Sequence, residues 1–199
     1  MDLRNHDARA QRVLAAIETF LDVFDERVES EHATNVLYGN TPLTGRKLGD
    51  EYGQKPERFI VENLITEIAG ALNYDYRSQP VGFDGINGTP DFTALAAEPT
   101  VVGEIKEPNR IEHAREQSFR YVQQATARPL VGVATDGWTW ILHTAEEDES
   151  PTYEKHVSLR SVFKDIAREK GHERSPRRDR RELRMECAEF VEAFSVEVV

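Results

Sequence analysis

The chain has 199 residues, of which 39% are hydrophobic and 31% are charged, and its net charge is -11. This length suits one compact domain, and the composition excludes a disordered, a collagen-like and a disulfide-rich chain, since Cys187 is the single cysteine. No apolar run approaches the ~20 residues that cross a bilayer, and the first residues lack the apolar stretch of a secretory signal. We therefore expect no membrane partner and a location in a reducing cytoplasm.

The charge is distributed unevenly along the chain. Residues 1–150 carry 14 basic and 26 acidic side chains, whereas residues 151–199 carry 11 basic and 10 acidic ones. Arginines outnumber lysines by 19 to 6, and six of the arginines lie between Arg174 and Arg184. An acidic, lysine-poor chain favours a halophilic origin, because at about 1 M salt the screening length falls to about 3 Å and self-repulsion weakens.

Hydrophobic spacing predicts two long helices in the first part of the chain. Apolar residues recur three and four positions apart from about residue 7 to about residue 30, and again from Pro56 to Leu72, where Pro56 suits a first helical turn. The segment between the two helices is rich in Gly, Pro, Asn and Thr, and we expect one long loop there. Residues 1–55 thus form an N-terminal helix and loop.

Short strands alternate with helices after residue 73. Asp136-Gly137 favours a tight hairpin, since glycine accepts a positive φ without strain, and Trp138 and Trp140 are expected to pack in the strand that follows rather than to stack on bases. The predicted elements are strand 74–81, hairpin 90–106, helix 110–127, hairpin 129–144, strand 152–157, helix 158–170 and helix 181–194. This order predicts an α/β fold with a central mixed sheet flanked by helices: the core is residues 56–157, and residues 158–199 add C-terminal helices with an Arg-rich linker.

Two carboxylates and an amine are predicted to converge at the first of these hairpins. Asp91 lies at its start, and in its second strand Glu104 and Lys106 project from one face while Ile105 packs on the other. Mg²⁺, with Mn²⁺ as an alternative, prefers oxygen ligands, so Asp91, Glu104 and the Ile105 carbonyl would hold it. Lys106 would orient water or neutralise the charge that develops on a phosphate.

The alternative interpretation is an exposed hairpin that bears ordinary surface charges. Glu104 argues against it, because this residue lies in the otherwise apolar run of residues 101–105, where an unpaired carboxylate is costly to bury. A cation or a metal ion next to Glu104 would remove this cost. The sequence therefore favours a metal site.

Helical phase selects a third carboxylate. With about 100° of rotation per residue, Glu57 falls on the apolar stripe of helix 56–72, whereas Glu62 and Glu67 fall more than about 90° from it. We expect Glu57 to lie with the core and to reach the metal directly or through water. The alternative is that Glu57 only benefits from the dipole of its helix.

The helix of residues 110–127 presents polar side chains beside its buried stripe. Gln117 and Tyr121 are four residues apart and lie on one flank of the helix, together with Arg110 and Gln124. These groups would donate hydrogen bonds to a substrate phosphate or hold Glu104 in place. A solvated helix flank is the alternative.

These motifs resemble the PD-(D/E)xK nuclease superfamily, and most closely the amino-terminal nuclease domain of type I restriction motor subunits and its stand-alone relatives. The resemblance covers about residues 55–145. The motifs that carry it are Glu57, Pro90-Asp91, Glu104-Ile105-Lys106, Gln117 to Tyr121, and Thr135-Asp136-Gly137 before two tryptophans. It implies a restriction-endonuclease-like core and Mg²⁺-dependent hydrolysis of DNA. It further implies that Asp91 and Glu104 are ligands, Lys106 is catalytic, Glu57 is the helix acid, and Gln117 and Tyr121 are an auxiliary pair.

We therefore expect a Mg²⁺-dependent DNA endonuclease of a restriction or genome-defence system. The chain has no ATP-binding Gly-Lys-Ser/Thr loop and no methyltransferase signature, so it would act alone, as a homodimer, or with protein partners of a larger complex. The alternative is a non-catalytic module of the same fold that binds DNA or docks such a complex.

The Arg-rich tail is a second candidate for DNA binding. It is the dense positive cluster of an acidic chain, and arginine contacts to backbone phosphates release counterions. A solvated linker is the alternative. The tail residues assigned to nucleic-acid binding are Arg177, Arg178, Arg180 and Arg181.

Overall fold

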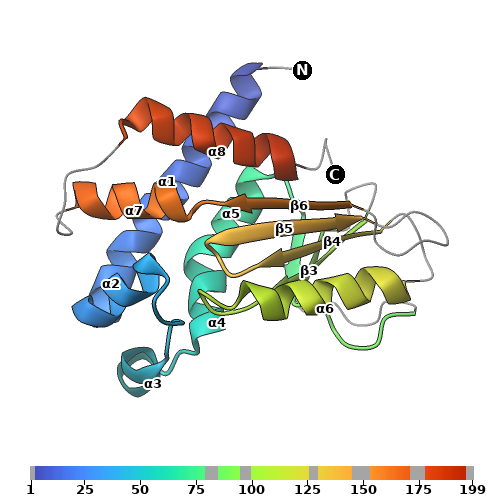
Figure 1. Cartoon of the computed structure of the whole chain (residues 1–199), viewed down its shortest axis with the longest axis horizontal. Coiled ribbons are helices and arrows are strands. Elements are labelled where there is room, and N and C mark those ends of the chain that lie inside the picture. Colours follow the sequence, from blue (N-terminus) through green and yellow to red (C-terminus); the bar gives the residue numbers. More distant parts are fainter. Residues whose placement is uncertain are drawn as a thin grey trace.

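The protein is built on one six-stranded sheet, with helices packed on both of its faces (Figure 1). The computed structural model describes residues 3–78, 85–94, 100–125, 130–144, 153–170 and 178–195. The strands follow one another across the sheet in chain order; β3 and β4 are parallel and all other neighbours are antiparallel. The strands are β1 (Tyr76–Ser78), β2 (Phe92–Ala94), β3 (Thr100–Ile105), β4 (Leu130–Thr135), β5 (Thr139–Thr144) and β6 (Tyr153–Ser158). The predicted α/β fold with a mixed sheet is therefore confirmed.

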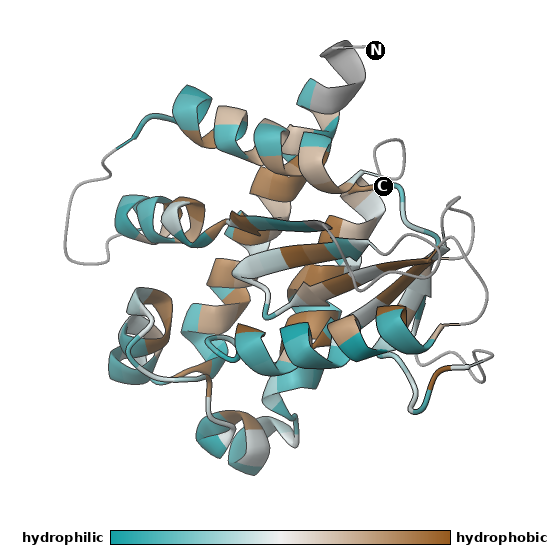
Figure 2. Ribbon diagram, turned by 45° about the vertical axis from the view of Figure 1, so that its right-hand side comes forward, coloured by the Kyte–Doolittle hydropathy of each residue, from teal (hydrophilic) through white to brown (hydrophobic). Residues whose placement is uncertain are grey.

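The helices divide between the two faces of the sheet. Helix α6 packs on β3, β4 and β5 from one side, while α1, α5 and α8 share a large hydrophobic core with the other side. The helices are α1 (Leu3–Arg27), α2 (Ser30–Tyr38), α3 (Arg46–Tyr52), α4 (Pro56–Ile60), η1 (Val61–Ile65), α5 (Thr66–Ala71), α6 (Ile111–Gln124), α7 (Arg160–Glu169) and α8 (Arg180–Phe194). Figure 2 shows brown stretches along the strands, whereas the helices alternate between teal and brown, as amphipathic helices do.

The expectation of one long loop after the first helix is wrong. Helix α1 ends at Arg27, and the following segment forms α2 and α3, each ended by a glycine in the left-handed conformation, Gly39 at φ 83° and Gly53 at φ 59°. Helix α2 buries Val36 and Leu37, and α3 buries Leu48. The turn residues that suggested a loop therefore end two short helices.

The second predicted helix is confirmed from Pro56 to Ala71. Pro56 lies in the first turn, as expected, and the buried residues of α4, η1 and α5 face α1. The middle segment, η1, is a π-helix, which the apolar spacing does not reveal. The first turn of α4 lies near the ends of β1, β2 and β3, where the candidate site is found.

Both predicted hairpins are present. In the first, Phe92 lies opposite Gly103, and its ring occupies the space where a β-carbon of residue 103 would stand. In the second, Asp136, Gly137 and Trp138 form the turn, with Gly137 at φ 84°, so Trp138 precedes β5 instead of lying in it as predicted. Trp138 and Trp140 are 1% and 0% exposed, so the prediction that they pack in the core is confirmed.

The core includes residues from the N-terminal, central and C-terminal segments of the chain. Trp140 of β5 packs against Phe190 and Phe194 of α8, with ring centroids 5.4 and 6.1 Å apart. Helix α8 also lies along α1. Among the described helices, none is both long and apolar enough to cross a membrane.

Candidate active site

A cleft of ≈ 650 Å³ opens between the start of α4 and the ends of β1, β2 and β3. We call it the β3 cleft. Its lining contains acidic and basic side chains, one aromatic ring and the last residue of β3. The lining residues are Gly53, Lys55, Glu57, Arg58, Val61, Tyr76, Ser78, Asp91 and Ile105. Three of the predicted site residues, Asp91, Glu57 and Ile105, thus share one cavity.

Glu104 is the buried carboxylate of the site. The alternation of β3 places Val101 and Ile105 in the main core and turns Glu104 towards α6, as predicted. Its side chain is 3% exposed; Oε1 accepts a hydrogen bond from Lys106 Nζ at 2.5 Å, and Oε2 accepts one from the Tyr121 hydroxyl at 3.1 Å. Burial raises the pKa of Glu104, and the nearby charge of Asp91 raises it further. The hydrogen bonds from Lys106 and Tyr121 act in the opposite direction and lower it.

Asp91 is held beside Glu104 by the backbone of β3. Its N–H donates to the Gly103 carbonyl at 2.9 Å, and its Oδ2 accepts from the Ile105 N–H at 2.8 Å. The carboxylate thus extends the β2–β3 ladder by one residue and lies at the strand end, facing the cleft. The predicted convergence of Asp91 and Glu104 is present.

Lys106 connects the carboxylates. Its Nζ bonds to Glu104, lies 3.2 Å from the Ile105 carbonyl oxygen and 3.9 Å from Glu57 Oε1. Its backbone N–H donates to the Thr135 carbonyl at 3.0 Å, which continues the pairing of β3 with β4. Burial disfavours the ammonium charge, but the hydrogen bond to Glu104 and the surrounding carboxylates outweigh burial and raise the pKa of Lys106.

Glu57 lies at the cleft, but the expectation that it packs with the core is wrong. Its side chain is 48% exposed in the first turn of α4, where Phe59 and Ile60 are the buried residues. Partial burial raises its pKa against the attraction of Lys106. Of the three helix acids it is the one beside Lys106, since Glu62 instead accepts from Arg58 at 2.6 Å and from Gln54.

Gln117 and Tyr121 support Glu104 from α6. Gln117 Nε2 lies 3.5 Å from the Tyr121 hydroxyl, which in turn donates to Glu104. Tyr121 is 3% exposed, so it is not part of a solvated helix flank. Burial and the neighbouring Glu104 raise the pKa of Tyr121 to about 12, which keeps its hydroxyl a donor at neutral pH.

The other two residues of this flank have contacts of their own. Gln124 Oε1 accepts from the Asn87 N–H at 3.0 Å and so ties the end of α6 to the segment before β2. Arg110 precedes α6, is exposed and lies 3.8 Å from Glu107. Gln124 is therefore a structural contact, while Arg110 faces solvent.

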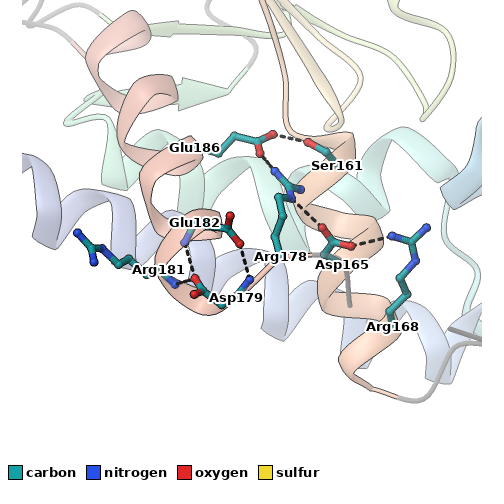
Figure 3. Close-up of polar contacts among 8 residues, drawn as sticks. All are labelled: Ser161, Asp165, Arg168, Arg178, Asp179, Arg181, Glu182 and Glu186. Atoms are coloured by element: carbon teal, nitrogen blue, oxygen red, sulfur yellow. Dashed lines mark hydrogen bonds and ion pairs between the residues drawn. The ribbon is translucent and has the colours of Figure 1, made fainter. Parts of the chain in front are cut away.

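Two of the tail arginines, Arg178 and Arg180, are ion-paired rather than part of a free positive cluster, and Figure 3 shows the contacts of Arg178. Arg178 lies between Asp165, at 2.8 Å, and Glu186, and Arg180 pairs with Glu18 and Glu169. Carboxylates of α1, α7 and α8 thus neutralise these two side chains. Arg181 is exposed and uses its backbone N–H in the cap of α8, whereas Arg177 lies outside the described residues.

The position of α8 also separates the tail from the site. In Figure 1, and in the turned view of Figure 2, α8 lies at one end of the molecule, and α3 and the start of α4 lie at the other. Arg178, Arg180 and Arg181 therefore do not line the β3 cleft. A local charge count cannot reveal this, because three of the acids that pair with Arg178 and Arg180 come from α1 and α7, and only Glu186 comes from α8 itself.

The oxygen donors at the β3 cleft fit a hard divalent cation. In the described parts of the chain, no three His, Cys, Asp or Glu side chains are grouped closely enough to hold a metal by themselves. Mg²⁺ commonly uses only one or two carboxylates, together with waters and substrate phosphate oxygens. Asp91, Glu104 and the Ile105 carbonyl offer such a set, and a cation would compensate the buried charge of Glu104.

Three cleft residues were not singled out from the sequence. Lys55 and Arg58 bring positive charge to the rim, and the ring of Tyr76 stacks on Phe92 with centroids 5.3 Å apart. The first two flank Pro56-Glu57, so basic residues around a helix start next to a predicted acid were the available signal. Tyr76 carried no signal, because its approach to the cleft depends on the pairing of β1 with β2.

Comparisons of the chain with protein-family models, with curated proteins and with solved structures found no match. The function of the β3 cleft therefore rests on its own geometry and on the motifs that make up its lining.

Proposed function

We propose that this chain is a divalent-metal-dependent nuclease that hydrolyses phosphodiester bonds of DNA. The observation that carries the proposal is the convergence of Asp91, the buried Glu104 and Lys106 at the end of one hairpin, beside an open cleft with a basic rim. A carboxylate pair with an adjacent amine is the chemistry that metal-assisted phosphoryl hydrolysis needs.

Each residue has a role that follows from its contacts. Asp91, Glu104 and the Ile105 carbonyl would hold Mg²⁺ or Mn²⁺, and Glu57, whose Oε1 lies 3.9 Å from Lys106 Nζ, would accept a hydrogen bond from a water of the metal. A bound metal supplies Lewis-acid polarisation of the phosphate and a nucleophilic water. Lys106 places a fixed positive charge where negative charge develops on the phosphate, and Tyr121 with Gln117 holds Glu104 in position.

We also propose a biological role for this activity. The resemblance to nuclease domains of restriction enzymes favours a role in restriction or genome defence in the cytoplasm, alone, as a homodimer or with protein partners. The single six-stranded sheet and its helices form one domain-sized unit, which suits either a stand-alone enzyme or a component of a complex.

One contact favours a second candidate, a nuclease-fold module that binds DNA without cutting it. Lys106 Nζ lies 2.5 Å from Glu104 Oε1 and also contacts the Ile105 carbonyl, so the amine occupies oxygens that the metal needs. If this pairing persists with metal present, the site binds a phosphate through Lys106 but does not cleave it.

Nicking of supercoiled plasmid DNA separates the two candidates. The full chain is incubated with Mg²⁺, with Mn²⁺ or with EDTA, at low and high KCl, and is compared with Asp91→Asn and Lys106→Met. We expect metal-dependent nicking that both substitutions abolish, while Glu62→Gln, a matched change on the same helix outside the site, nicks like the parent. Calorimetry should show weaker Mg²⁺ binding in Asp91→Asn, whereas Lys106→Met should keep Mg²⁺ binding or strengthen it, because the amine that contacts Glu104 and the Ile105 carbonyl is gone. Nicking that resists EDTA or survives both substitutions contradicts the proposal.

A further inference from the structure

A second pocket, of ≈ 230 Å³, lies where the end of α1 meets the starts of α2 and α3. We call it the corner pocket. Basic side chains dominate its lining, which is unusual in a chain with a net charge of -11. The lining residues are Arg27, Val28, Glu29, His32, Thr44, Arg46, Lys47 and Leu48.

The three cations of the corner pocket are not neutralised by the protein. Arg46 is exposed and Lys47 Nζ donates to a neutral group, the Glu26 carbonyl, at 2.9 Å. Arg27 donates to the Gln54 amide oxygen at 3.4 Å and lies over the Tyr52 ring. Within the described residues none of the three forms an ion pair, in contrast to Arg178 and Arg180 of the tail.

The other polar groups of the pocket do not cancel this charge. Glu29 is the single carboxylate of the lining, so three cations face one anion. The Nε2 of His32 accepts a hydrogen bond from the Thr44 N–H at 3.1 Å. The pocket therefore keeps a net positive charge with two guanidinium groups and one ammonium.

Contacts join the corner pocket to the β3 cleft. Gly45, which precedes α3, is so close to the Pro56 ring that a β-carbon on it would lie 3.2 Å from Pro56 Cδ. Arg27 bonds to Gln54, and the next residue, Lys55, already lines the cleft. In Figure 1, α3 and α4 are neighbours at one corner of the molecule. Lys55 thus lies between the corner pocket and the cleft rim, where Arg58 is paired with Glu62.

We propose that the corner pocket binds a backbone phosphate of the nucleic acid whose scissile phosphate lies in the β3 cleft. This inference rests on the proposed function. Guanidinium groups bind phosphate oxygens through paired N–H donors, and unpaired cations on an otherwise acidic protein concentrate a polyanion at one corner. The DNA path then follows α3 and α4, not the arginines of α8.

DNA binding without cleavage tests the proposal. The full chain carrying Asp91→Asn is titrated in EDTA against a short fluorescent DNA duplex over a KCl series. Each phosphate contact that is lost should flatten the slope of log Kd against log salt by about one. We expect this for Arg46→Gln, about twice that change for Arg46→Gln with Lys47→Gln, and an unchanged slope for Arg12→Gln, an exposed arginine of α1 outside both pockets.

The outcomes distinguish the subsite from the nuclease. An unchanged salt slope in the double variant, with an unchanged melting temperature, overturns the subsite whether or not the parent cuts plasmid DNA. Loss of slope in a protein whose parent never nicks plasmid supports the subsite and overturns only the nuclease. If inorganic phosphate raises the melting temperature of the parent alone while the DNA slopes agree, the pocket holds free phosphate and the proposal fails. Arg46→Gln alone serves if the double variant does not fold.

Discussion

Single residues decide whether the β3 cleft holds a reactive site or a set of surface charges. Glu104 is nearly inaccessible to water, and the Lys106 amine and the Tyr121 hydroxyl both donate hydrogen bonds to its carboxylate. Glu57 differs in kind, since its carboxylate is half exposed and only approaches Lys106. A buried acid and an exposed acid around one lysine can divide the work between holding a cation and handling its water.

The role of Glu57 can be separated from that of its helix. We expect Glu57→Gln to lower the metal-dependent nicking rate by about 10-fold to 100-fold, because removal of a charged group that supports a metal typically has that effect. Glu62→Gln should stay close to the parent, since Glu62 bonds to Arg58 and Gln54. Initial nicking rates over a Mg²⁺ series measure both. The reverse order of effects would transfer the site to Glu62.

His143 makes a prediction about pH and stability. Its ring is 0% exposed, and burial, opposed by Glu154 and assisted by Arg115, lowers its pKa below the ordinary value of 6.5. As the pH falls below 6.5, His143 is protonated in the unfolded chain before it is protonated in the folded protein. The free energy of unfolding is therefore highest above pH 6.5 and decreases below it, by at most about 1.4 kcal/mol per pH unit.

Urea titrations over a pH series test this effect. His143→Leu should remove part of the loss of stability on acidification, whereas His156→Gln, at an exposed position on β6, should not. Identical pH profiles of the parent and His143→Leu would show that His143 titrates equally in the folded and unfolded states.

Elements are held together by fits that individual residues do not reveal. The β2–β3 hairpin closes because Gly103 leaves room for the Phe92 ring, and the same pairing fixes Asp91 against Ile105. Helix α7 is fastened to α8 through Asp165, which is 4% exposed and bonds to both Arg168 and Arg178. Packing in the first case and ion pairing in the second set the geometry.

Gly103 is a test of the first fit. A β-carbon at this position would lie within 1.9 Å of the Phe92 ring, so Gly103→Ala should destabilise the fold by about 1–3 kcal/mol or more. Gly70→Ala, in α5 with no atom within 4 Å, should instead add up to about 1 kcal/mol through helix propensity. Chemical denaturation gives both values. A neutral Gly103→Ala would mean that the Phe92 ring moves aside freely.

Arg178 is a test of the second fit. Arg178→Gln leaves buried Asp165 with fewer donors and should cost about 1–3 kcal/mol of the free energy of unfolding. Arg181→Gln, at an exposed neighbouring position, should change it by less than about 0.5 kcal/mol. Equal effects in urea denaturation would contradict a structural role for Arg178. Truncation before the tail is not a substitute experiment, since it removes α8 and the packing of Phe190 and Phe194.

The whole molecule has a large net negative charge, while three basic side chains that form no ion pair among the described residues line the corner pocket. The net charge is -11, so acidic side chains repel one another at low ionic strength. Salt weakens this repulsion, because the screening length falls from about 10 Å at 0.1 M to about 3 Å at 1 M salt. We expect the corner pocket to attract a polyanion, because Arg27, Arg46 and Lys47 line it. Salt should therefore act on folding and on DNA binding in opposite directions.

Stability should rise with salt. We expect the urea midpoint to increase from about 0.1 M to about 1 M KCl as screening weakens the repulsion between acidic side chains. A variant with Glu31, Glu51 and Glu67 changed to Gln, all exposed, should be more stable at low salt and gain less from KCl. A urea midpoint that does not change with KCl in either protein would contradict the halophilic interpretation.

The sequence by itself determined the elements whose information is local. Apolar spacing predicted α1, the helix from Pro56, α6, α7 and α8, because a helix repeats its buried face every three to four residues. Strand alternation placed Glu104 and Lys106 on one face, and Asp136-Gly137 located a hairpin. The motifs that define the candidate site were therefore readable before the fold was known.

Tertiary structure alone decided everything that depends on distant partners. The exposure of Glu57 is set by how α4 meets the sheet, and the neutralisation of Arg178 and Arg180 requires acids from α1, α7 and α8. The corner pocket exists because α1, α2 and α3 converge. Charge acts through space, so a sequence reveals how many charges a chain carries, and only the fold determines which of them remain free to bind.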